Sequence, residues 1–170
     1  MKSGVEIEIA KAAFAELAAQ FPTLNMIPEP EAPVEVSIHL PAQPGLSQAV
    51  WLGFQNNDEL HFSVGHFWLE WFPCTEPFKL REYIDAVSGY LSGRYRVVEH
   101  YSGARCVKAE LQAPVGSQWQ TVGTWRNLWS LLPGKRTSHV LRNDAQPAVQ
   151  RDVHAAASRL TDLRDLRDLR

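Results

Sequence analysis

Apolar side chains recur with two different periods along this chain, and each change of period marks a predicted change of secondary structure. The first stripe has the spacing of an amphipathic helix over residues 6–21. A second helical stripe lies between Pro77, which a first helical turn tolerates, and Gly93, which suits the end of a helix. The apolar members of the two stripes are Ile9, Ala13, Phe14, Leu17 and Phe21, then Leu80, Ile84, Val87 and Leu91.

Between these two stripes the period is two, which predicts half-buried strands. Apolar residues occupy even positions between residues 34 and 64, but odd positions in residues 67–71. The parity changes at Gly65-His66, so these residues are either a two-residue hairpin loop or a bulge in one long strand. Glycine in the first position suits a II′ turn, which slightly favours the hairpin.

The strands of residues 49–71 have a predicted register. If Asn56-Asn57-Asp58 is a three-residue loop, the alternation pairs Phe54 with Leu60, Leu52 with Phe62 and Val50 with Val64. If Gly65-His66 also turns the chain, the third strand places Phe67, Leu69 and Trp71 opposite the same core-facing residues. The two alternations therefore support one register independently.

Three more strands are predicted over residues 95–101, 107–111 and 119–125. Ser102-Gly103-Ala104 reads as the turn between the first two. As a three-residue loop it would place Arg96 opposite Glu110 and His100 opposite Cys106. The Arg96–Glu110 pair is then expected to be a surface salt bridge.

Strands and helices that come in blocks with short connections predict an α+β fold. We expect an antiparallel sheet of about six to seven strands built from hairpins, with two to three helices packed mainly on one face. The expected organisation is a single α+β domain over residues 1–130, an irregular arm over 131–147 and a C-terminal amphipathic helix over 148–170.

The predicted C-terminal helix begins near Pro147 and ends in three Asp-Leu-Arg repeats. Its apolar residues follow a four-three spacing, which is typical of a helix-packing seam. We expect this helix to pack on the body of the protein or on a second copy of itself. The seam consists of Val149, Val153, Ala156, Leu160 and Leu163.

Composition and charge narrow the class of protein. The 170 residues are 45% hydrophobic and 21% charged, as in average soluble domains, and the net charge is −2. This balance gives no global reason to expect nucleic acid or an anionic membrane as a partner, and we expect neither.

The two cysteines, Cys74 and Cys106, lack metal-site spacing and suit a reducing compartment, so the cytoplasm is the expected location.

The sequence contains none of the strong catalytic or nucleotide-binding motifs, such as GxSxG, HExxH, GxGxxG or a Walker loop. The predicted register nevertheless places a polar notch on the face opposite the core. There His61 and Glu70 lie across from each other between Trp51 and Trp68, beside Gly53, which would leave a gap. These four side chains are candidate ligand-binding residues, but an ordinary cross-strand pair is the simpler interpretation. We predict no catalytic residue, no metal and no cofactor.

Three functions remain open. The leading hypothesis is a non-catalytic binding or protein-interaction module, whose partner is another protein or a second copy of the chain. The first alternative is a small-molecule-binding domain with an aromatic pocket around Trp51, His61, Trp68 and Glu70. The second is an enzyme whose active site is assembled from scattered residues, which geometry rather than sequence spacing would reveal.

Overall fold

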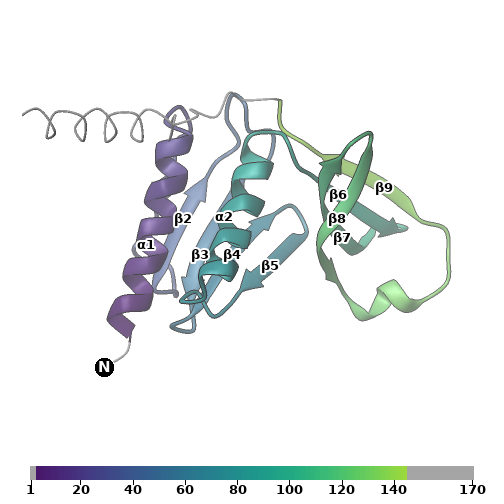
Figure 1. The fold of residues 1–170 in the computed structure, drawn as a ribbon. Coiled ribbons are helices and arrows are strands. Elements are labelled where there is room, and N and C mark those ends of the chain that lie inside the picture. Colours follow the sequence, from purple (N-terminus) through teal and green to yellow (C-terminus); the bar gives the residue numbers. More distant parts are fainter. Residues whose placement is uncertain (1–2, 145–170) are drawn as a thin grey trace, which may run out of the picture.

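The computed structural model describes residues 3–144 as two antiparallel sheets, two α-helices and one short 3-10 helix (Figure 1). The α+β class and the antiparallel hairpins are confirmed. The strands divide between a sheet of five and a sheet of four, where the sequence suggested about six to seven strands in one sheet. The elements are α1 Ser3–Gln20, β1 Ile27–Pro28, β2 Val36–Leu40, β3 Val50–Gln55, β4 Glu59–Val64, β5 Phe67–Trp71, α2 Pro77–Leu91, β6 Arg96–Ser102, β7 Arg105–Val115, β8 Gln118–Arg126, η1 Leu128–Leu131 and β9 Thr137–Leu141.

The first sheet has the order β1-β2-β3-β4-β5, and α1 and α2 lie side by side over one of its faces (Figure 1). The predicted register is confirmed, with Phe54 opposite Leu60 and Phe62 opposite both Leu52 and Leu69. Phe62 has no exposed surface and contacts the ring of Tyr90 on α2. The even-numbered face of β3 and β4 is therefore the core face, which the helices cover.

The turn at Gly65-His66 is a hairpin and not a bulge, because Val64 pairs with Phe67 on either side of it. Gly65 has a φ of +56°, a backbone conformation that glycine adopts without the steric cost of a Cβ atom. A Cβ atom at Gly65 would also collide with the carboxylate of Glu99. The turn thus requires glycine both for its own geometry and for its contact with the second sheet.

The second sheet has the order β8-β7-β6-β9, and its inner face packs on β5. Gly123 on β8 allows this close approach, since a Cβ atom there would lie 3.0 Å from the side chain of Leu69. Val97, Ala109 and Leu111 on the inner face join the same hydrophobic cluster as the residues between the helices and the first sheet. One continuous core therefore connects the two sheets.

The second hairpin differs from the predicted register. The loop is the two residues Gly103-Ala104, because Ser102 pairs with Arg105, and a bulge follows between His100 and Tyr101. Each change shifts the pairing by one residue, so Arg96 lies opposite Gln112 and His100 opposite Lys108. The expected Arg96–Glu110 pair is therefore wrong.

The arm predicted to be irregular contains regular structure. Residues Thr137–Leu141 form β9, which pairs with β6 along its whole length. The sequence of β9 has no apolar alternation, because β9 is an edge strand whose side chains are almost all exposed. The predicted domain limits stay a prediction, and the predicted helix over 148–170 lies outside the described residues.

Within residues 3–144, no helix is long and apolar enough to cross a membrane.

Candidate functional site

The structure brings the four predicted ligand-binding residues together on the face of the first sheet that the helices leave open. His61 lies opposite Glu70 on β5 and opposite Gly53 on β3, as predicted. Trp51 and Trp68 both pair with Ser63, one on each side of it. The predicted row of aromatic and polar side chains is present.

The predicted gap beside Gly53 is filled. The indole ring of Trp51 lies over Gly53, in the space that a Cβ atom there would occupy. Its Nε1–H donates to the hydroxyl of Ser37 at 2.8 Å, and that hydroxyl donates to a carboxylate oxygen of Glu29 at 2.8 Å. This chain of hydrogen bonds fixes the ring in place, so the notch is closed by the residue that was expected to form its wall.

His61 is correspondingly only 1% exposed. Its ring stacks on Trp68 at a centroid distance of 5.4 Å and lies 6.1 Å from Trp51. Its Nε2 lies 3.2 Å from a carboxylate oxygen of Glu59, two residues earlier on the same strand, so its hydrogen-bond partner is Glu59 and not Glu70. His61 therefore packs as part of an aromatic layer.

Across residues 3–144, no group of three His, Cys, Asp or Glu side chains is placed to hold a metal ion. His39 lies opposite Trp51, on the same face as His61, without completing such a group.

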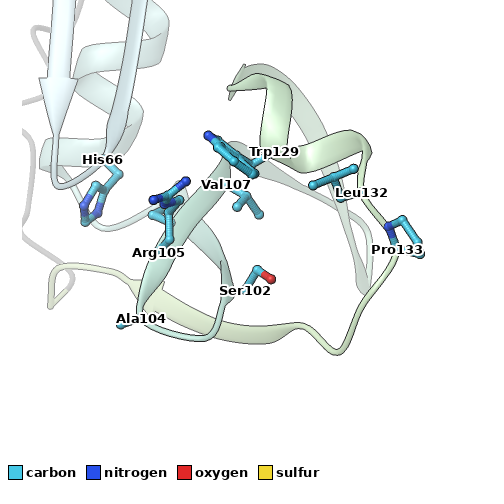
Figure 2. Close-up of a pocket in the computed structure, with 9 residues that line it drawn as sticks. His66, Ser102, Ala104, Arg105, Val107, Trp129, Leu132 and Pro133 are labelled. Carbon is cyan, nitrogen blue, oxygen red and sulfur yellow. The ribbon is translucent and has the colours of Figure 1, made fainter.

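A separate hollow lies at the turn end of the second sheet (Figure 2). It has a volume of about 820 Å³. Figure 2 shows His66 at one end, Leu132 and Pro133 at the other, and Arg105 and Trp129 between them. Its lining comes from the β4–β5 turn, the β6–β7 hairpin, η1 and the residues after η1, which are His66, Ser102, Ala104, Arg105, Cys106, Val107, Trp129, Leu132 and Pro133.

A buried carboxylate orients the histidine of this hollow. Oε1 of Glu99 accepts a hydrogen bond from the backbone N–H of His66 at 2.6 Å and lies 3.1 Å from its ring Nδ1. Oε2 of Glu99 accepts a hydrogen bond from the hydroxyl of Tyr101 at 2.6 Å. The side chain of Glu99 is 5% exposed, whereas that of His66 is 54% exposed. The histidine is thus held at its Nδ1 side and open to solvent at the other.

These hydrogen bonds determine the protonation of the cluster. Burial acts to raise the pKa of Glu99, but hydrogen bonds from Tyr101 and His66 outweigh it and lower the pKa below its usual value. The same hydrogen bond raises the pKa of Tyr101 to about 12. Because an ionised carboxylate only accepts hydrogen bonds, its contact with Nδ1 of His66 requires the tautomer with a proton on Nδ1, and no hydrogen bond within residues 3–144 occupies Nε2.

Arg105 supplies a cation to the same hollow. Its guanidinium group lies over the indole ring of Trp129, 4.5 Å from the ring centroid. This stacking orders a side chain that is otherwise exposed, and it leaves the N–H groups at the edge of the guanidinium plane available to an anion. Arg105 and His66 therefore line one hollow from two different elements.

The two thiols are poorly suited to nucleophilic chemistry. Burial, supported by the charge of Asp58, raises the pKa of Cys74 to about 11. Burial, together with the charge of Glu99, also raises the pKa of Cys106, which lines the hollow but is only 5% exposed. Both cysteines are free and buried.

No known protein family, no curated protein and no solved structure matches this chain.

Proposed function

We propose that this protein is a non-catalytic binding protein whose hollow beside η1 holds the carboxylate or phosphate group of a small, partly apolar molecule. The observation that carries the proposal is the Arg105 guanidinium spread over Trp129 in the same hollow as the free Nε2 of His66. Arg105 would form charge-assisted hydrogen bonds with the anionic group. Trp129, Leu132 and Pro133 offer an apolar surface for the rest of the ligand.

The chemistry of the lining supports binding rather than catalysis. The thiol of Cys106 is buried and has a raised pKa, so little thiolate would form near neutral pH. Tyr101 also keeps its proton, because its pKa is raised to about 12. The oriented histidine then serves to recognise the ligand, as an acceptor when neutral and as a donor when protonated.

Phenyl phosphate is a suitable probe, and NMR of the histidine ring signals reports its position. We expect phenyl phosphate to shift the ring signals of His66, with little change at His61. Arg105→Gln should weaken binding by about tenfold or more, since hydrogen bonds to charged groups contribute about 1.5–3 kcal/mol. Arg94→Gln is the matched control, because Arg94 is exposed and stacks on Tyr95 instead.

Two results would contradict the proposal. One is the absence of any shift at His66 at saturating phenyl phosphate, and the other is an equal loss of affinity in Arg94→Gln and Arg105→Gln.

A second candidate is a contact with another copy of the chain through η1. Large apolar side chains are exposed there together, and such patches mark contact surfaces. The exposed fractions are 83% for Leu128, 53% for Trp129, 73% for Leu131 and 53% for Leu132. If this patch joins two copies, sedimentation of the full chain should show a dimer that Leu128→Ser with Leu131→Ser converts to a monomer. A wild-type monomer at high concentration argues against it.

The cytoplasm stays the proposed location, because two buried free thiols suit a reducing compartment.

A further inference from the structure

Charge is distributed very unevenly along this weakly acidic chain. Residues 1–91 contain twelve carboxylates but only Lys2, Lys11, Lys79 and Arg81 as cations. Residues 92–144, which form the second sheet and its connections, reverse this balance with eight cations against Glu99, Glu110 and Asp144. The eight cations are Arg94, Arg96, Arg105, Lys108, Arg126, Lys135, Arg136 and Arg142. Residues 92–144 are therefore basic, although the net charge of the whole chain is −2.

Half of these cations lie on the outer face of the second sheet, opposite the face that packs on β5. Directly paired residues of antiparallel strands share a face, and Lys108 pairs with both His100 and Arg126. Arg96 pairs with Gln112, which in turn pairs with Thr121. The rest of this face is mostly uncharged and polar, which makes it a cationic surface able to donate and accept hydrogen bonds.

The one carboxylate on this described face is already neutralised. Glu110 accepts from His100 at 2.7 Å and from Lys108 at 2.8 Å. Burial acts to raise the pKa of Glu110, but the bonds from Lys108 and His100 prevail and lower it. Arg96 and Arg142 form no ion pair with an acid in residues 3–144, so their charge is available to a partner.

An aromatic platform lies at one end of the face. The guanidinium group of Arg96 is 4.1 Å from the ring centroid of Trp119, and that of Arg142 is 5.2 Å from it. Arg96 is further held by a hydrogen bond from its Nε to Gln112 at 2.9 Å, and Arg142 by one from its Nε to the backbone carbonyl of Gly93 at 2.9 Å. The two guanidinium planes are thus ordered before any partner arrives.

We propose that the outer face of the second sheet binds single-stranded nucleic acid. Phosphates would contact Arg96, Arg142 and Arg126, which form no ion pair within residues 3–144, while bases stack on the planes of Trp119 and its two arginines. This reverses the expectation drawn from net charge alone. The proposed surface is also separate from the hollow, because none of these residues lines the hollow.

Two features favour a single strand over the other anionic partners. An acidic peptide would use the positive charge but not the flat stack of guanidinium and indole groups, which is a platform for unpaired bases. A duplex keeps its bases stacked on each other, so it would meet only the cations. A sheet face with aromatic and basic side chains is the surface on which common single-strand-binding modules place their bases.

The test is fluorescence anisotropy of the full chain with fluorescein-labelled dT15, a length within the site sizes of about 4–16 nucleotides known for such surfaces. With three phosphate contacts, the plot of log affinity against log salt should have a slope of about −2. Affinity should then fall roughly twentyfold between about 50 and 200 mM salt. Arg96→Gln with Arg142→Gln should reduce the slope to about −0.7 and weaken binding by more than about tenfold.

Matched variants separate this surface from a general charge effect. Lys79→Gln with Arg81→Gln removes the same charge from α2 and should leave affinity within about twofold. Trp119→Phe, which keeps an aromatic plane, should bind within about threefold of wild type, whereas Trp119→Leu should lose about fivefold or more.

The proposal is wrong if wild-type protein does not bind dT15 at low salt, or if the α2 double variant loses as much affinity as the outer-face double variant. It is also wrong if polyglutamate or the dT15–dA15 duplex competes as well as unlabelled dT15.

Discussion

The two sheets of this molecule differ in how firmly their local sequence determines strand register. In the first sheet, strict alternation on both sides of each turn specifies the pairing, and β3, β4 and β5 adopt it. In the second sheet, bulges shift the register between His100 and Tyr101 and again between Leu111 and Gln112. A bulge adds one residue to one strand, so it shifts every cross-strand pair beyond it. The number of apolar residues in the strand stays the same.

The uncovered faces of the two sheets also differ in chemistry. That of the first sheet is closed by its own aromatic side chains, since Trp51 fills the space above Gly53 and Trp68 stacks on His61. That of the second sheet is basic, and its arginines are spread over Trp119. Aromatic residues consolidate the structure in the first case and organise cations in the second. The presence of tryptophan on an open face therefore does not by itself mark a ligand site.

The largest predicted effect tests the core of the first sheet. Phe62→Ala removes a fully buried ring that contacts both Phe67 and Tyr90, so unfolding should become easier by about 3–5 kcal/mol. Phe78→Ala on α2 is the size-matched control, because Phe78 is 66% exposed, and it should change stability by less than about 1 kcal/mol. Urea denaturation followed by circular dichroism measures both. Similar losses in the two variants would be inconsistent with this core.

A smaller effect is expected where the sheets meet. Gly65→Ala combines a positive φ with a collision against Glu99 and Leu141, and should destabilise by about 2–4 kcal/mol. Gly103 has a similar φ of +59° but open space around it, so Gly103→Ala should cost only about 1–2 kcal/mol. Thermal and urea unfolding of the pair isolates the contact between the sheets from the cost of the turn. Equal losses would mean that the Gly65 turn does not pack against Glu99.

The smallest of the three effects depends on pH. Glu99→Gln weakens the hydrogen bonds from Tyr101 and His66 and should destabilise by about 1–3 kcal/mol at neutral pH. Because folding lowers the pKa of Glu99, its carboxylate contributes stability above the unfolded value of about 4.3, and this contribution is lost as pH falls through the folded pKa. The difference between wild type and variant should therefore shrink below about pH 4. Urea midpoints measured across this range check it, and a difference that does not depend on pH would argue against an ionised Glu99.

The candidate sites show which features of a site the sequence could predict and which it could not. It placed Trp51, His61, Trp68 and Glu70 on one face, since strand parity determines which side chains share a face. It did not predict that Trp51 would turn onto Gly53, because a ring has several rotamers and the choice depends on Ser37 from β2 and Glu29 from the β1–β2 connection. It did not predict the hollow, although a hairpin turn was the slightly favoured interpretation of Gly65-His66.

The sequence by itself determined the two helices, strands β2 to β5 and the register of β3, β4 and β5, because these follow from periodicity and turn chemistry within short segments. Only the tertiary structure decided that the strands form two sheets, that Glu99 meets His66 from 33 positions away, and that Arg105 stacks on Trp129 in the lining of the hollow. It also decided that half of the cations of residues 92–144 share one face of the second sheet, since the bulges determine which side chains lie on that face. These contacts join segments that local pattern cannot relate, because the packing of one sheet on another depends on the shapes of both surfaces at once.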